Sequence, residues 1–374
     1  MGAMDDLISP ALVAQMRAAL RSVAPAMDTP NLAHAETAVL GASLRRRVDI
    51  VRDALLDDLP AGFAPTEEVV LYLLGEPRFA GWMIWPTTEV VAARALGSGS
   101  EQDFDSGMAL LARLTTGLTS EFAIRGLLAA RPERALAIMQ TWTTHDDEHV
   151  RRLATEGSRA YLPWAKRVPW LLAHPRATEG ILDGTYRDPS EYVRRSVANH
   201  LNDLSRIDSA VVVDIGKRWA GDPNVNTPWV LRHGLRTLAK RADPGALALL
   251  GFSGDELDVE RPQLSRGLVP WGEEIAISAQ VRNHGSAEAL VAIDYSIGFQ
   301  RANGSVSPKT FKLAVRRIPP GDTVIVDKTF SFRRITTRTY YPGRHYVAVQ
   351  ANGVVSEPAD FVLDDPRPSQ MTAR

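Results

Sequence analysis

The sequence predicts a chain of two parts, an all-α array of repeats followed by an antiparallel β-sandwich. From Ala11 to about Leu250 the apolar residues recur at spacings of three and four, and Pro or Gly interrupts them every 12 to 20 residues. That pattern is typical of helices joined by short turns. After Gly251 the apolar spacing changes to two, as it does between Glu274 and Arg282. A period of two predicts strands with one buried face.

Three segments of the first part repeat one pattern. Each carries a valine near its start, and these valines are 43 and 37 residues apart. Such a period is typical of HEAT-like repeats, in which each pair of helices buries its apolar face by stacking on its neighbours. The segments are Glu148–Glu156, Glu191–Asn199 and Pro228–Arg236, with valines Val150, Val193 and Val230.

The second part contains short strands separated by turn residues. Turn-forming residues occur at 283–286, 319–322 and 341–344. About seven short strands over roughly 100 residues are typical of an immunoglobulin-like sandwich. Because the chain has no cysteine, packing alone must hold this sandwich together. The clearest strand candidates are residues 274–282, 291–299, 310–315, 323–332 and 344–350.

These patterns predict two domains, a helical domain of residues 1–255 and a sandwich of residues 262–366. The linker is expected near residues 253–266. The last eight or so residues are rich in Pro, Ser and Arg and are expected to be disordered.

Composition excludes several kinds of site. Without cysteine there are no disulfides, thiolate nucleophiles, iron–sulfur clusters or Cys-ligated zinc. His145 and His149 flank three acidic residues, which is more typical of a helix start than of a metal site. We therefore expect no metal and no cofactor. With no apolar run of about 18 residues and no signal-peptide pattern, we expect a cytoplasmic protein without a membrane partner.

The formal net charge of -1 hides an uneven distribution. Residues 121–245 hold 19 basic against 15 acidic residues, and residues 301–345 hold 10 against 2. Two basic blocks, one in each part, would suit a single polyanion contacted by both.

A polar stripe accompanies the repeat pattern. An arginine follows each repeat valine by two residues, and a second polar residue stands four positions later, on the same helical face. Equivalent positions of successive repeats line up along a solenoid, so the stripe could follow a phosphate backbone. The alternative is that these arginines form ion pairs between helices. The stripe consists of Arg152, Glu156, Arg195, Asn199, Asp203, Arg232 and Arg236.

Five blocks of the helical part resemble the AlkC branch of bacterial alkylbase DNA glycosylases. They cover the whole helical region in the right order, and some members of that family also carry a C-terminal immunoglobulin-like domain. Two departures are Gly126-Leu127 where the family usually has Pro-Phe, and Ala160-Tyr161 where Pro-Arg is common. The second departure removes one possible phosphate contact near Trp164. The blocks are Glu121-Phe-Ala-Ile-Arg125, His149–Ala165, Ser190–Ser205, Arg232–Lys240 and Ala246–Phe252.

The resemblance implies base excision repair, with release of 3-methyladenine and 3-methylcytosine from duplex DNA and without the deep base-flipping pocket of most glycosylases. N3-methylation makes the base a cationic leaving group, so carboxylates beside C1′ need mainly to stabilise an oxocarbenium-like sugar and position water. Glu156, Glu121 and Asp203 are the expected catalytic carboxylates. Trp164 is expected to stack on the lesion or deoxyribose, and Phe122 to pack or to contact the DNA beside the lesion.

The expected partner is double-stranded DNA with alkylated bases, and the remaining expected contacts are to its phosphates. The protein is expected to be a monomer whose sandwich acts as a DNA clamp. Simpler roles exist for three residues: a helix first turn for Glu121, a buried loop cap for Asp203, and closure of the core between repeats for Trp164. For the whole protein the alternatives are a non-enzymatic HEAT-repeat scaffold and a lesion-sensing DNA-binding protein. The expected phosphate-contacting residues are Arg152, Arg195, Asn199, Arg232, Arg236, Arg316, Arg317, Arg333 and Arg334.

Overall fold

The computed structural model describes residues 4–252, 256–335 and 338–364. They form two compact units, one within residues up to Gly234 and one from Leu235 onward. Helices fill the first unit and strands dominate the second, which confirms the predicted order of an all-α array followed by a β-sandwich. Residues 365–374, where the sequence predicts a disordered tail, lie outside the described residues.

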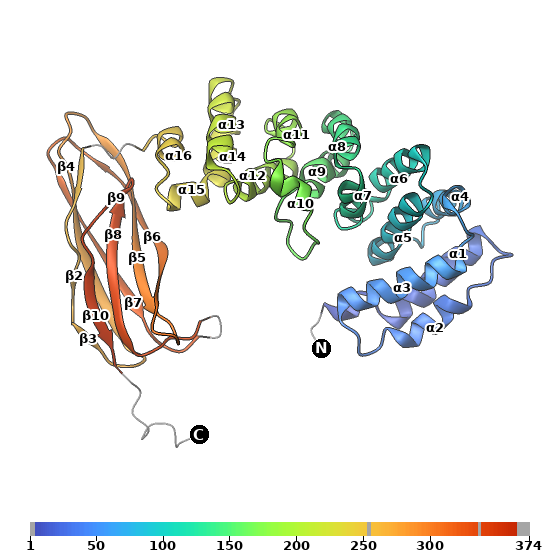
Figure 1. Cartoon of the computed structure of the whole chain (residues 1–374), viewed down its shortest axis with the longest axis horizontal. Helices are drawn as coiled ribbons and strands as arrows, with labels where there is room; N and C mark the ends of the chain where they lie inside the picture. Colours follow the sequence, from blue (N-terminus) through green and yellow to red (C-terminus); the bar gives the residue numbers. More distant parts are fainter. Residues whose placement is uncertain (1–3, 253–255, 336–337, 365–374) are drawn as a thin grey trace, which may run out of the picture. The chain divides into compact units, whose positions relative to one another are not determined.

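The first unit is a stack of helices that pack on their neighbours, coloured blue to yellow-green in Figure 1. Proline begins α1, α2, α8 and α10, where its missing N–H would have no helical partner. The helices are α1 (Pro10–Val23), α2 (Pro30–Ala38), α3 (Leu44–Asp58), α4 (Phe63–Leu74), α5 (Ile84–Gly97), α6 (Glu101–Leu114), α7 (Ile124–Ala130), α8 (Pro132–Thr141), α9 (Glu148–Gly157), α10 (Pro169–Ala173), α11 (Glu179–Thr185), α12 (Glu191–Leu204), α13 (Ser209–Gly221) and α14 (Thr227–Gly234).

The three predicted repeat segments correspond to helices α9, α12 and α14, except that the third segment extends beyond α14, which ends at Gly234, to Arg236 in α15. Burial explains their shared pattern. Val150, Val193 and Val230 are all buried, and α12 packs against both α9 and α14. Gly234 permits the close approach of two of these helices, because a Cβ there would lie 2.7 Å from Leu201 Cδ2. The HEAT-like stacking predicted from the valine spacing is therefore confirmed.

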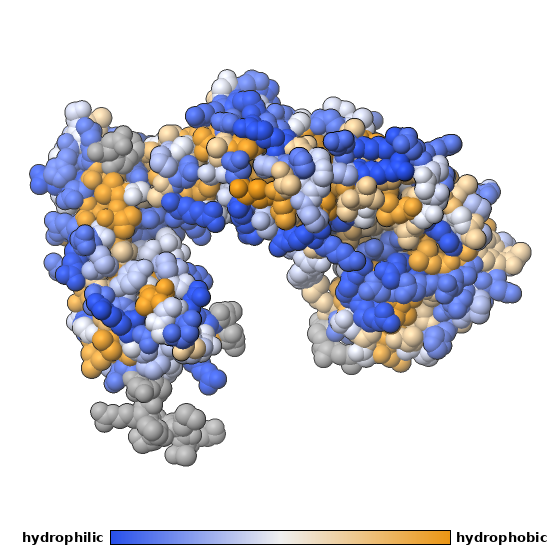
Figure 2. All heavy atoms as spheres, in the orientation of Figure 1, coloured by the Kyte–Doolittle hydropathy of each residue, from blue (hydrophilic) through white to orange (hydrophobic). Residues whose placement is uncertain are grey.

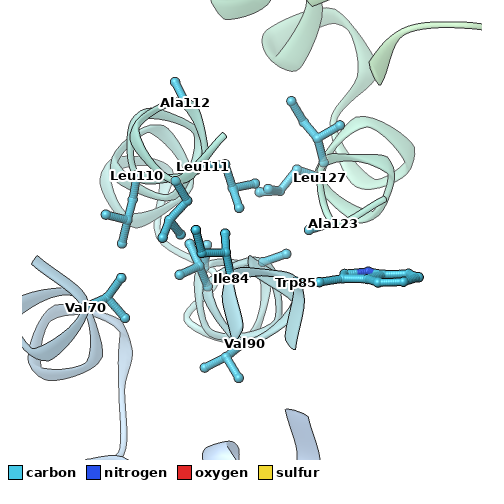
Figure 3. Packing of buried hydrophobic residues seen from close by; sticks show 14 of the residues in the cluster. Val70, Ile84, Trp85, Val90, Leu110, Leu111, Ala112, Ala123 and Leu127 are labelled. Atoms are coloured by element: carbon cyan, nitrogen blue, oxygen red, sulfur yellow. The ribbon is translucent and has the colours of Figure 1, made fainter. Parts of the chain in front are cut away.

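The apolar core of the first unit continues through successive helices. In Figure 3, Leu111 of α6 and Leu127 of α7 point toward Ile84 at the start of α5. The ring of Trp85 extends to the edge of this cluster, beside Ala123. Trp85 is therefore placed where the core meets the surface of the unit.

The second unit contains two short helices and a sandwich of two sheets (Figure 1). One sheet has the order β1-β4-β2 with β7 paired to β4, and the other has the order β3-β10-β8-β5-β6 with β9 paired to β8. The elements are α15 (Arg236–Lys240), α16 (Pro244–Leu249), β1 (Leu257–Val259), β2 (Gln263–Leu264), β3 (Leu268–Val269), β4 (Glu274–Asn283), β5 (Ala289–Gln300), β6 (Val306–Ile318), β7 (Thr323–Ser331), β8 (Gly343–Ala351), β9 (Val354–Val355) and β10 (Ala359–Leu363).

Aliphatic side chains form most of the core of the sandwich, and a cluster of aromatic rings packs with them, where no disulfide is available. The ring centroid of Phe332 lies 5.1 Å from that of Phe330 and 5.7 Å from that of Phe361. The amide Nδ2 of Asn283 donates to the carbonyls of Ala287 at 2.8 Å and Ile318 at 2.9 Å. These contacts fix the turn predicted at 283–286, and the five strongest strand candidates are confirmed as β4 to β8.

The linker predicted near residues 253–266 is wrong at two points, where the structure has short strands. Leu257–Val259 and Gln263–Leu264 are strands β1 and β2, and both pair with β4. Strands of three and two residues give too little alternation to be recognised in a sequence. Residues 253–255 lie outside the described part of the chain.

The surface of the first unit is mixed. In the view of Figure 2, hydrophilic side chains cover most of the visible face, and apolar side chains appear between them in small groups. No helix in the described part of the chain is long and apolar enough to cross a membrane.

Candidate active site

A cavity of about 330 Å³ opens in the first unit. Its wall combines the start of α5, the segment before α7, the end of α9 and the loop that follows α9. Most of the wall is apolar or aromatic, and two carboxylates interrupt it. Negative charge beside aromatic faces favours a cationic ligand. The lining residues that matter below are Trp82, Trp85, Glu121, Phe122, Glu156 and Trp164.

Glu156 is held by hydrogen bonds to both of its carboxylate oxygens. The residue is only 6% exposed. Its Oε1 accepts from Arg159 Nη1 at 2.6 Å, and its Oε2 accepts from the Ser196 hydroxyl at 2.6 Å. Arg152 Nη2 lies 3.7 Å from Oε1. Charge-assisted bonds from two sides fix the direction in which this carboxylate faces the cavity.

Arg159 connects Glu156 to Asp203 between two stacked repeats. Its Nε donates to Asp203 Oδ2 at 2.8 Å, and Arg159 and Asp203 are both buried. Burial raises the pKa of Asp203, and the charge of Arg159 only partly offsets this effect. Burial would lower the pKa of Arg159, but its two acidic partners outweigh burial and raise it. With both acids ionised, the three side chains carry a net negative charge.

Glu121 reaches the same cavity from the segment before α7. The buried hydroxyl of Ser120 donates to the carbonyl of Leu111 at 2.8 Å and thereby anchors this segment on α6. Glu121 Oε2 accepts from Arg152 Nη1 at 2.8 Å and from the Thr119 hydroxyl at 3.0 Å. Arg152 therefore bridges Glu121 and Glu156, although the two carboxylates lie 35 positions apart in the chain.

The guanidinium of Arg152 also lies over an aromatic ring, with its Cζ 4.9 Å from the ring centroid of Tyr192. Burial would lower the pKa of Arg152, but the charges of Glu121 and Glu156 outweigh burial and raise it. Arg152 is therefore a fixed cation between two carboxylates.

Arg125 anchors the loop of residues 158–168, which follows α9 and extends away from the helices in the view of Figure 1. Its Nη1 donates to the carbonyls of Gly157 at 2.9 Å and Arg159 at 2.5 Å, and its Nε donates to the carbonyl of Lys166 at 3.2 Å. Burial, and then the nearby positive charges of Arg167 and Arg159, lower the pKa of Arg125 to about 10. One buried guanidinium thus holds both ends of the loop.

Trp164 lies at the exposed tip of this loop. It is 82% exposed, and its backbone has φ +61°, a left-handed conformation that costs a bulky residue free energy. The alternative role of closing the core between repeats is wrong, because a core residue would be buried. Phe122, by contrast, stacks on Trp85 with ring centroids 4.8 Å apart and an interplanar angle of 23°.

The predicted polar stripe is brought together only in part. Arg152, Glu156 and Asp203 belong to one network. Arg152 lies beside Glu156, and Arg159 bonds to both Glu156 and Asp203. Arg195 stays outside it, with 62% of its side chain exposed and its Nη2 2.6 Å from Glu191 Oε1. Asn199 Oδ1 lies 3.1 Å from His233 Nε2 and links α12 to α14. This pair lies within α12, so the alternative of ion pairs between helices does not describe Arg195; it describes Arg152 better, which bonds to Glu121 ahead of α7.

The other predicted cations lie at or near the surface of their units. Arg232 is exposed at the end of α14, and Arg236, in the second unit, is half-buried. In the sandwich all four predicted arginines are exposed. Arg317 pairs with Glu288 at 2.9 Å, and Arg316 Nη1 donates to the carbonyl of Val315 at 3.0 Å. The sandwich arginines are Arg316, Arg317, Arg333 and Arg334.

Sequence reasoning missed four residues that build the cavity and its charges. Arg159 and Arg125 are needed to place Glu156 and the loop, and Trp82 and Trp85 line the cavity wall. The spacing of Arg159, three residues after Glu156 on one helical face, was a signal for an ion pair. The tryptophan pair lies some 35 residues before Glu121, and only packing brings it there.

Among the described residues, no group of three or more His, Cys, Asp or Glu side chains is placed to hold a metal ion. His145 and His149 flank the start of α9, where the Asp147 side chain accepts from the backbone N–H of His149 at 2.7 Å. The prediction of a helix start at this point is confirmed.

Comparison with known proteins gives matches to both parts of the chain. Residues 258–365 match a family model described as the C-terminal immunoglobulin-like domain of the uncharacterised protein YhaZ. The uncharacterised protein YhaZ of Bacillus subtilis is 36% identical over 259 residues, which cover 69% of this chain and 72% of the relative.

One solved structure covers nearly the whole chain. The alkylpurine DNA glycosylase AlkC of Pseudomonas fluorescens, bound to DNA containing an abasic-site analogue, superposes with a TM-score of 0.82 and 32% sequence identity. The match covers 97% of this chain and all of that one.

Proposed function

The chain belongs to the AlkC family of DNA glycosylases, and on this premise we propose that it releases N3-alkylated bases from duplex DNA. The observation that carries the proposal is the pair of carboxylates, Glu121 and Glu156, in the wall of an aromatic cavity. Such a wall suits the cationic base and the cationic sugar that the reaction requires.

The proposed reaction is hydrolysis of the N-glycosyl bond. The bond between C1′ and the base nitrogen breaks, and its electron pair neutralises the positive charge of the alkylated base. The sugar becomes oxocarbenium-like, and a water oxygen then bonds to C1′ and gives up a proton to a carboxylate or to solvent. The products are a neutral free base and an abasic site. Because the leaving base needs no added proton, no general acid is required.

We assign Glu121 and Glu156 to the cationic sugar and to the water. Both line the cavity, and Arg152 and Arg159 hold their orientation through bonds of 2.8 Å and 2.6 Å. Asp203 is absent from the lining among the described residues, so we assign it a positioning role exerted through Arg159. Preorganised charges of this kind need no rearrangement during the reaction.

Aromatic residues are proposed to contact the damaged nucleotide. Trp164 offers an exposed face at the rim of the cavity, and Phe122 is braced by its stacking on Trp85. A cation over a desolvated aromatic face gains about 2 kcal/mol. We further propose that the base is not turned into a deep pocket, because an N3-alkylated base is already a good leaving group.

The partner is DNA, and we propose that both parts of the chain contact its phosphates. The candidates Arg152, Arg195, Asn199 and Arg232 lie in the helical first unit, and Arg236 lies in the second unit. In the sandwich, residues 262–366, the candidates are Arg316, Arg317, Arg333 and Arg334, which all expose their side chains. We propose that the protein acts as a monomer in the cytoplasm.

The test is to incubate the purified protein with methylated duplex DNA and to identify the released bases by chromatography. We expect 3-methyladenine and 3-methylcytosine. Glu156→Gln should reduce the release rate about 100-fold or more, since it removes a charge from the site of the cationic transition state. Its affinity for a duplex with an abasic-site analogue should change little.

The matched control is Glu133→Gln, which removes an exposed carboxylate at the start of α8 in the same unit. Its release rate should equal that of the wild type. Release of no base by a wild-type protein that binds methylated DNA would support a lesion-sensing protein instead. Unchanged release by Glu156→Gln would exclude Glu156 from the mechanism.

A further inference from the structure

Tyr161 brings together two arginines from different repeats. The Cζ of Arg167 lies 4.3 Å from the ring centroid of Tyr161, and the Cζ of Arg206 lies 5.2 Å from it. Arg167 and Tyr161 belong to the loop after α9, whereas Arg206 follows the end of α12. Two guanidinium groups over one aromatic ring are held by cation–π attraction despite their like charge.

Both arginines keep their charge available to a ligand. Arg167 and Arg206 are exposed, and within the described residues neither forms an ion pair. Neighbouring arginines of the same repeats are paired: Arg151 with Asp188 at 2.6 Å, and Arg152 with Glu121 at 2.8 Å. An exposed pair of cations without a carboxylate partner is suited to an anion from outside the chain.

The pair is also held in place. Arg125 binds the carbonyl of Lys166, the residue directly before Arg167. Arg206 stands three residues after Asp203, which Arg159 fixes at 2.8 Å. The ring of Tyr161 joins these two anchored segments. An anion would therefore meet two cations that lose little conformational freedom on binding.

The local balance of charge favours an anion further. The positive charges of Arg167 and Arg159 add to burial in lowering the pKa of Arg125, and the negative charge of Asp203 only partly offsets them. Trp164, three residues after Tyr161 in the same loop, is at the rim of the cavity. The pair therefore belongs to the loop that also carries the aromatic residue assigned to the lesion.

We propose that Arg167 and Arg206, assembled on the ring of Tyr161, bind a phosphodiester of the DNA strand beside the lesion. This inference rests on the proposed function, because it names DNA as the source of the phosphate. It also changes the expectation drawn from the Ala160-Tyr161 departure, which predicted the loss of a phosphate contact. The tyrosine instead gathers Arg167 of its own loop and Arg206 from the segment after α12.

The test is the salt dependence of affinity for a duplex with one abasic-site analogue, measured by fluorescence anisotropy at several salt concentrations. Because the two arginines share one phosphate, the double variant Arg167→Gln/Arg206→Gln should lower the slope of log Kd against log salt concentration by about 0.9, and each single variant by part of that amount. Each should weaken binding severalfold at moderate salt. Arg176→Gln, which removes an exposed arginine paired with Glu179 and Asp214 in the same unit, is the matched control and should leave the slope unchanged.

Variants of Tyr161 distinguish a role of its ring in DNA binding from a role that only stabilises the loop. Tyr161→Phe keeps the ring and should bind as the wild type does, whereas Tyr161→Leu keeps apolar bulk without a π face and should lose affinity. If Tyr161→Leu lowers only the melting temperature, with affinity and slope unchanged, the ring braces the loop and the proposal is overturned.

Measurements on the wild-type protein distinguish failure of this inference from failure of the proposed function. A wild-type protein that releases methylated bases and binds DNA, but whose slope is unaffected in Arg167→Gln and Arg206→Gln, refutes only this inference. A wild-type protein with no salt-dependent affinity for DNA refutes the proposed function itself.

Discussion

The two units of this protein use charge in opposite ways. In the helical unit, Glu156, Asp203 and Arg159 are buried and bonded to one another over 2.6 to 2.8 Å. In the sandwich, the core is apolar and the four predicted arginines are exposed, singly or in surface pairs such as Arg317 with Glu288. Buried charges hold fixed positions, whereas exposed charges adapt to a partner and are screened by salt.

This difference separates two tasks that the proposed function requires. Stabilising a cationic transition state needs carboxylates at defined places in a region of low dielectric. Gripping a phosphate backbone of any sequence needs only mobile positive charge. The following predictions test whether the charges of the two units differ in function because they differ in burial, and not because of charge alone.

The largest expected effect is on stability, from Arg159→Met. This change leaves Glu156 and Asp203 buried without their shared cation, and the free energy of unfolding should fall by about 3 to 5 kcal/mol. Denaturant unfolding followed by circular dichroism measures it. Arg195→Met, which breaks the exposed pair with Glu191, should cost no more than about 1 kcal/mol. Equal losses of unfolding free energy in the two variants would contradict the expected difference between buried and exposed charges.

A smaller effect concerns His200, which is fully buried beneath the same network. Its Nδ1 lies 2.9 Å from the carbonyl of Thr155, so Nδ1 carries a proton. Burial, followed by the charge of Arg159, lowers the pKa of His200 to about 3. In the unfolded chain the imidazole takes up a proton below about pH 6.5, which favours unfolding.

The free energy of unfolding should therefore fall as the pH drops from 6.5 toward 5, with His200 contributing up to about 1.4 kcal/mol per pH unit. His200→Gln should reduce this slope, and the exposed His34→Gln should keep it. Unfolding curves at a series of pH values give both slopes. An identical slope in all three proteins would show that His200 is accessible to protons in the folded state.

The smallest effect on stability is expected in the sandwich. Replacement of Arg316, Arg317, Arg333 and Arg334 by Gln should change the free energy of unfolding by no more than about 0.5 kcal/mol for each substitution. The salt slope of DNA affinity should nevertheless fall by about 0.9 for each arginine that contacts a phosphate. Arg266→Gln, outside the basic block of the same unit, is the control. An unchanged slope in the fourfold variant would leave the sandwich without a role in binding.

The fold was largely predictable because its signals are periodic. Repeated valines and alternating strands persist over many residues, so Val150, Val193 and Val230 could be placed in the core and β4 to β8 could be bounded. Short strands such as β1 and β2 lack that length, and the expected linker was therefore misplaced.

The site was predictable only where one helix or a family pattern carried it. Arg152 and Glu156 share a helical face, and the resemblance supplied Glu121. No periodicity indicates that Arg159 reaches Asp203, 44 positions away, or that Trp85 stacks on Phe122. Such contacts depend on how the repeats pack against one another. The spacing of side chains within one helix does not specify that packing.

Other arginines of this chain donate to backbone carbonyls as Arg125 does. Arg47 donates to the carbonyls of Ala42 and Ile8, Arg94 to that of Leu56, and Arg194 to that of Asp188. Each guanidinium ties a helix to a loop or to a neighbouring helix, and Arg125 and Arg47 do so through Nε and Nη1 together, a geometry that a lysine could not copy. A molecule without cysteine thus gains cross-links that persist in oxidising and reducing surroundings alike.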